Sequence, residues 1–158
     1  MRGAEQFVKR CSAIAAAALI LLLAAVAAYA APAAQLTVEE MKSRLSSTSV
    51  GDKPHLCLAI AERQLEATDK LYNAAQIEQA QSTLTDVVAY SELARDYAVQ
   101  SHKHQKQTEI AVRNMARRLA DIEHLVTHDE EEPIQAAIKR LQHVRDDLLM
   151  AMFPKGKQ

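Results

Sequence analysis

The span between Pro54 and Pro133 contains neither glycine nor proline, and this feature constrains the fold more than any other in the chain. These two residues most disfavour the interior of a helix, so their absence removes the usual points of interruption. The span is rich in Ala, Gln, Leu, Glu, Lys and Arg, and it has no alternating run of β-branched residues that would indicate a strand. We therefore predict an all-α fold.

A heptad pattern runs through residues 76–126 without a slip in register. Its two inward positions hold no charged residue; they are Ile77, Ala80, Leu84, Val87, Ser91, Ala94, Ala98, Ser101, Gln105, Thr108, Val112, Met115, Leu119, Ile122 and Val126. A sustained seven-residue repeat of this kind is typical of helices that pack side by side in a coiled coil. We predict one long central helix over about residues 76–126, with antiparallel hairpins built on it.

A short helix is expected before the main helical region. Thr37-Val38-Glu39-Glu40 has the sequence of a capping box, and a serine-rich linker follows at residues 46–51. We assign this helix and its linker to residues 31–54. The helical bundle domain then covers residues 55–153, and residues 154–158 form a polar tail.

Two further helices flank the central one within this domain. Asp52 and Pro54 favour a helix start, and that helix is expected to end near Asn73. The last helix is expected from about Pro133 to Phe153, because acidic residues precede this proline and favour the N-terminal end of a helix dipole.

The lengths of these helices distinguish two architectures. An unbroken central helix would extend roughly 75 Å, and the flanking helices would leave residues 95–105 uncovered. The alternative is a break in this polar stretch, which would fold the chain into a compact four-helix bundle. We favour the unbroken helix, because no glycine or proline marks a break.

The first thirty residues have the composition of a secretory signal peptide. Lys9 and Arg10 precede an uncharged run rich in Ala and Leu, and the run ends in Ala28-Tyr29-Ala30. We predict a signal peptide over residues 1–30, with cleavage after Ala30, and hence a periplasmic or secreted protein. The alternative is an uncleaved membrane anchor, because a run of about 20 residues can span a bilayer.

The stretch from Leu71 to Ala80, with its bulky pair before a short turn, resembles the turn and second-helix start of a tetratricopeptide repeat. The resemblance covers one hairpin. The repeat's glycine position holds Thr68, and the next 34-residue frame places Asn114 where the repeat has alanine. The resemblance therefore implies a helical hairpin and no peptide-binding function.

Cys57 is the only cysteine that remains if the signal peptide is removed. Lys53 and His55 lie nearby in the first turn of its helix, an environment that lowers a thiol pKa and would make Cys57 reactive. The alternative is that Cys57 packs as a small hydrophobic residue among Leu56 and Leu58.

Two other groups of residues are candidate binding sites. Asp121, His124 and His128 share one face at helical spacing and could hold a metal ion weakly. Amphipathic aromatics and the polar stretch of the central helix suggest an interaction surface, formed by Tyr90, Tyr97, Ser101, His102, His104 and Gln105.

The sequence favours an interaction protein over an enzyme. It shows no ordered Ser/His/Asp set, no glycine-rich phosphate loop and no paired inward carboxylates, so we expect neither catalysis nor a cofactor.

Loss of residues 1–30 takes the formal net charge from −1 to −3, so nucleic acid is not an expected partner. We expect an exported scaffold or adaptor that binds a protein partner or forms a homodimer. The alternatives are an envelope metal- or small-ligand-binding sensor and a membrane-anchored helical protein.

Overall fold

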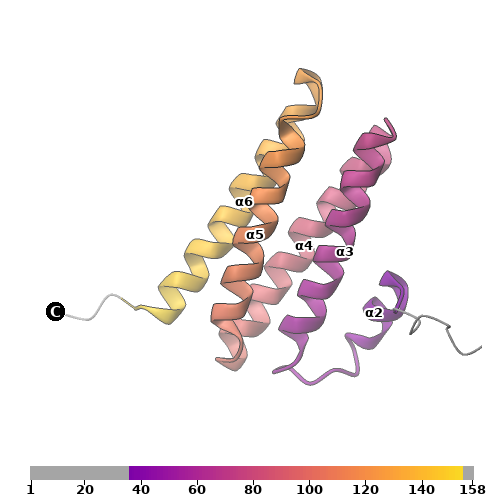
Figure 1. The fold of residues 1–158 in the computed structure, drawn as a ribbon. Helices are drawn as coiled ribbons and strands as arrows, with labels where there is room; N and C mark the ends of the chain where they lie inside the picture. The colour runs from indigo at the N-terminus through magenta and orange to yellow at the C-terminus, as the bar shows by residue number, and fades with distance from the viewer. Residues whose placement is uncertain (1–35, 155–158) are drawn as a thin grey trace, which may run out of the picture. The chain divides into compact units, whose positions relative to one another are not determined.

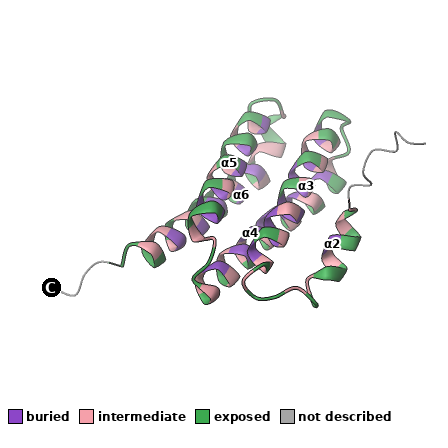
Figure 2. Cartoon of the chain, turned by 60° about the horizontal axis from the view of Figure 1, so that its bottom comes forward, coloured by how far each residue is buried: buried purple, intermediate pink, exposed green. Residues whose placement is uncertain are grey.

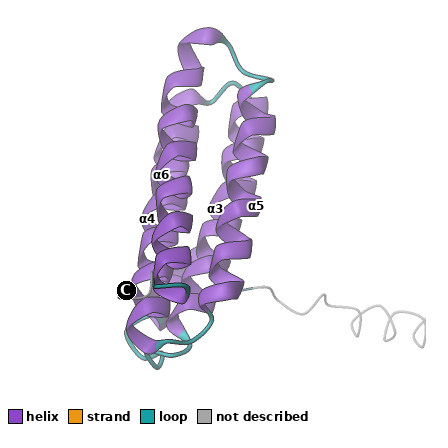
Figure 3. Cartoon of the chain, turned by 90° about the vertical axis from the view of Figure 1, so that its left-hand side faces the viewer, coloured by secondary structure: helices purple, strands orange, loops and turns teal. Residues whose placement is uncertain are grey.

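The computed structural model describes residues 36–154, which form helices joined by short connections (Figure 3). The helices are α2 (Val38–Arg44), α3 (Lys53–Asn73), α4 (Ile77–Ser101), α5 (Gln105–Glu123) and α6 (His128–Met152). No strand occurs between residues 36 and 154. The predicted all-α class is therefore confirmed.

Two helical hairpins lie side by side in this unit (Figure 1). The first hairpin consists of α3 and α4, and the second of α5 and α6. The contacts between the hairpins join α4 to α6, α3 to α5 and α4 to α5. Because each short connection reverses the chain direction, α4 and α6 run parallel to each other. Helix α2 lies against the first hairpin, on the side away from the second (Figure 1).

The predicted unbroken helix over residues 76–126 is wrong. Helix α4 ends at Ser101 and α5 begins at Gln105, and the connection holds His102 and His104 in the left-handed region, with φ of 55° and 59°. Each such residue costs about 1–2 kcal/mol. Folding back buries the apolar stripe of α5, and each large side chain of such a stripe contributes about 1.5–3 kcal/mol. Burial therefore outweighs the backbone cost, and the observed arrangement is the four-helix alternative.

The inward positions of the heptad pattern are confirmed as the face that packs into the bundle. Each is buried or half-buried, on both sides of the break (Figure 2). Ala98, inside the stretch expected to stay uncovered, is fully buried, and Ser101 and Gln105 are half-buried. The chain itself covers the region that motivated a homodimer.

Helix α6 begins at His128, five residues before the predicted start at Pro133. Thr127 and Glu130 form a capping box, in which the Thr127 backbone N–H donates to Glu130 Oε2 at 3.0 Å. The box satisfies backbone N–H groups that would otherwise lack partners, and it therefore sets the start of the helix. Pro133 lies inside the helix.

The capping box predicted at Thr37 is confirmed, since the Glu40 backbone N–H donates to Thr37 Oγ1 and Thr37 N–H donates to Glu40 Oε2. Helix α2 belongs to the same compact unit as the bundle, which begins at Thr37. It buries Met41.

The predicted signal peptide lies outside the described residues. Within residues 36–154, no helix combines the length and the apolar character that crossing a membrane requires.

Candidate functional site

The outer groove of the first hairpin, on the side away from the second, is filled by α2. Lys42 on α2 donates to Asp86 Oδ2 on α4 at 3.0 Å, and Gln64 on α3 donates to the same oxygen at 2.6 Å. The Lys42 ammonium also lies 5.6 Å from the centre of the Tyr90 ring. Three helices therefore meet at one carboxylate, and α2 also buries Met41.

The corresponding outer groove of the second hairpin is open. It is a cavity of about 410 Å³. Its lining comes from α5 and α6: Arg113, Ala116, Arg117, Ala120, Ile138, Leu141, Gln142 and Arg145. Small and aliphatic side chains supply the apolar part, and three guanidinium groups supply the charge. We call this cavity the arginine groove.

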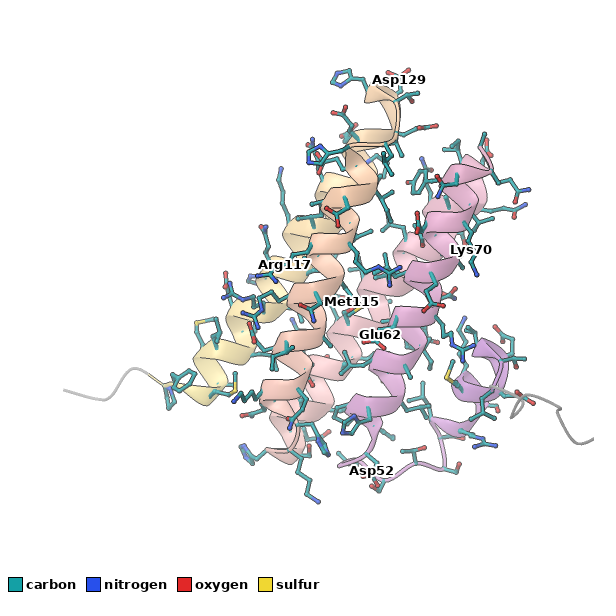
Figure 4. All side chains as sticks on the ribbon, in the orientation of Figure 1. Asp52, Glu62, Lys70, Met115, Arg117 and Asp129 are labelled. Atoms are coloured by element: carbon teal, nitrogen blue, oxygen red, sulfur yellow. The ribbon has the colours of Figure 1, made fainter. Side chains whose placement is uncertain are left out.

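The arginine groove carries a net positive charge. Glu109, 7% exposed, accepts a hydrogen bond from Arg145 Nε at 2.9 Å and lies 3.6 Å from Arg113 Nε. Arg117 makes no ion pair with any residue of the described part of the chain, and it lies on α5 on the side away from the first hairpin (Figure 4). Glu109 thus pairs with two of the three arginines that line the groove and leaves a positive excess, which favours an anionic ligand.

The groove between α4 and α6 differs from the arginine groove in its balance of positive and negative side chains. It contains two cavities of about 370 Å³ each. Arg140 there pairs with Glu92, and Arg95 pairs with both Asp147 and Asp96 at 2.8 Å. The carboxylates lining this groove outnumber the arginines, so it carries no net positive charge.

The sequence-predicted interaction residues are distributed over different surroundings. Tyr90 and Tyr97 are half-buried against the core, and Lys53 lies 4.8 Å from the centre of the Tyr97 ring. The Ser101 hydroxyl donates to the Tyr97 carbonyl at 2.7 Å. His102 is exposed and Gln105 is half-buried, at the two ends of the α4–α5 connection.

His104, the remaining member of that set, lies against a residue that the sequence did not link to it. Its Nδ1 is 2.9 Å from Nε2 of His55, which lies in the first turn of α3, and the ring centres are 4.0 Å apart. His55 is exposed and His104 is half-buried. The two residues are 49 positions apart, so no sequence spacing could have paired them.

Cys57, considered from the sequence either as a reactive thiol or as a small hydrophobic residue, lies on α3. The side chain is fully buried within the core. Burial raises the pKa of the Cys57 thiol to about 11, and the opposing effect of Lys53 is smaller. Desolvation therefore outweighs the nearby positive charge, and Cys57 packs as a small hydrophobic residue, as the alternative expected.

The three residues of the weak metal candidate lie around the α5–α6 connection. Asp121, His124 and His128 are all exposed, and His128 Nδ1 lies 3.2 Å from Glu131 Oε2. In the part of the chain from residue 36 to residue 154, no three His, Cys, Asp or Glu side chains come together in a way that could hold a metal ion.

Sequence reasoning missed the arginine groove. Arg113 and Arg117 are four residues apart, a spacing that places both on one face of a helix. That spacing was the only available signal, because Arg145 joins them from another helix. Comparison of the chain with known protein families, with curated proteins and with solved structures finds no match.

Proposed function

We propose that the protein is an exported helical interaction module that binds an acidic helix of a partner protein in the arginine groove. The observation that carries this proposal is the open groove itself, with apolar walls and three arginines beside a single carboxylate. The role is binding, and the proposal includes no catalytic step.

The packing of α2 supports a helix as the occupant. In the first hairpin a helix of seven residues fills the outer groove with one buried side chain, Met41, and one ion pair, Lys42 to Asp86. The second hairpin has a groove at the corresponding place, with the charge reversed. A partner helix that inserts one apolar side chain and presents carboxylates to Arg117 and Arg113 would fill it in the same manner.

A charge-reversal pair tests this proposal. Arg117 lines the groove, and the next residue, Arg118, is exposed and does not line it. Arg117→Glu and Arg118→Glu change the net charge equally. A photo-cross-linking residue replaces Ala120 in the purified protein, which is then mixed with an envelope extract and irradiated. The partner protein that becomes cross-linked to it is then identified.

We expect one acidic partner to be captured by the wild type and by Arg118→Glu, and capture to be lost in Arg117→Glu. Capture should also weaken as salt rises, because exposed charges are screened. Equal capture by both variants would show that the groove does not hold the partner.

Export is proposed on the composition of residues 1–30. N-terminal sequencing of the protein from its native host tests it: a mature chain that starts at Ala31 supports cleavage. A chain that retains Met1 and fractionates with membranes would favour the anchored alternative.

A further inference from the structure

We propose that His55 and His104 form a binding site for a divalent copper ion. The two residues come from different hairpins, since His55 lies on α3 and His104 immediately precedes α5. Their facing nitrogens, Nε2 of His55 and Nδ1 of His104, are 2.9 Å apart. Imidazole nitrogens are the commonest neutral metal ligands in proteins.

The separation of the two nitrogens is short enough for both to bind one metal ion. Two nitrogens bound at about 2.05 Å and at right angles are about 2.9 Å apart, whereas a tetrahedral angle separates them by about 3.3 Å. The observed distance is that of a hydrogen bond and is also compatible with neighbouring positions of a tetragonal centre. Among the divalent first-row ions, copper(II) binds nitrogen ligands most tightly, so we assign copper(II) to the site. Binding through both facing nitrogens would require the proton of the present hydrogen bond to move to the other nitrogen of its ring, or to solvent if that ring is charged.

The backbone at His104 determines how the site can be varied. His104 has a φ of 59°, in a region that residues other than glycine seldom adopt. Glycine or asparagine would fit the same conformation at lower cost, and neither could supply the imidazole.

The site is open to solvent on the side of His55, which is exposed. No third His, Cys, Asp or Glu joins the pair within the described part of the chain. Water would therefore complete the coordination. The ion would connect the start of the first hairpin to the start of the second, and it should therefore stabilise the folded state over the unfolded one.

Copper titration of the purified protein tests this inference. Calorimetry measures affinity and stoichiometry, and electron paramagnetic resonance reports the number of bound nitrogens. The informative variants are His55→Gln, which keeps a polar side chain on α3, and His104→Asn, because asparagine tolerates positive φ. The matched controls are His143→Gln and His102→Asn, which remove exposed imidazoles on α6 and at the same connection.

We expect one copper ion per wild-type chain, held by two nitrogens, and a thermal midpoint that rises with copper. Either informative variant should bind copper about 100-fold more weakly, because a single imidazole lacks the second imidazole that holds the ion close to it. The thermal midpoint of either variant should not change when copper is added. Both controls should behave as wild type. Unchanged affinity in the double variant His55→Gln/His104→Asn, or wild-type binding no tighter than that of His55→Gln, would overturn the assignment.

Discussion

The break between α4 and α5 can be tested by the sign of a single stability change. His102 adopts a φ of 55°, its side chain is exposed, and its backbone N–H donates to the Val99 carbonyl at 3.4 Å. Glycine adopts positive φ without a steric cost. The substitution His102→Gly should therefore stabilise the protein, although glycine normally destabilises a helical segment.

The expected magnitude follows from two opposing terms. Left-handed backbone costs a residue with a β-carbon about 1–2 kcal/mol, and glycine removes this cost. Glycine also gives the unfolded chain more freedom, which lowers stability by about 0.4–1 kcal/mol. The net gain should be about 0.5–1 kcal/mol. In a continuous helix the same substitution would instead lose about 0.5 kcal/mol, since glycine is the poorer helix former.

Urea denaturation followed by circular dichroism at 222 nm measures this difference. The control is Lys139→Gly, at an exposed position inside α6, which should lose roughly 0.5–1 kcal/mol. The urea concentration at the midpoint of unfolding should rise for His102→Gly and fall for Lys139→Gly. The dependence of the unfolding free energy on urea concentration should be similar in both variants. If both variants lose stability, the α4–α5 connection is helical and the reasoning is refuted.

Three further predictions concern the turn, the core thiol and the second hairpin. Ala75→Gly should stabilise the protein by about 0.5–1 kcal/mol in the same denaturation assay, because Ala75 has a φ of 55° at the end of α3; a loss would contradict the observed turn. Cys57 should resist alkylation in the folded protein and react after unfolding. Because its folded pKa is about 11 against an ordinary 9.0, stability should fall between pH 9 and 11, and this fall should be smaller in Cys57→Ala; identical pH profiles would count against burial of the thiol. Leu119→Ala, at a fully buried site, should cost about 2.7–5 kcal/mol, whereas Leu125→Ala, at a site 75% exposed, should change stability by less than about 0.5 kcal/mol.

Local sequence signals predicted several helix ends correctly, but the predicted start of α6 was wrong. The capping box at Thr37 and the end of α3 at Asn73 were correct, because caps and turns depend on residues a few positions apart. The same chemistry at Thr127 and Glu130 was overlooked in favour of Pro133, and the start of α6 was therefore placed five residues late. The information was present in the sequence, in a pattern of the same type.

The candidate sites depended on contacts between distant residues. His55 and His104 meet only because the connection after α4 turns the chain back toward α3. Arg145 reaches the side of α5 that carries Arg113 and Arg117 only in the observed register of α5 against α6. At Cys57 the sequence offered both a nearby positive charge and packing as a small hydrophobic residue, and only the tertiary structure shows that burial outweighs the charge.

The sequence by itself determined that the chain is helical and which side of each helix faces inward. Both properties follow from local propensity and from a repeat of a few residues, and the inward positions from Ile77 to Val126 are accordingly buried or half-buried. Only the tertiary structure decided that the repeat is divided between α4 and α5. The left-handed conformations of His102 and His104 are unfavourable on their own, and they are stabilised by apolar surface that becomes buried only when the two hairpins pack together.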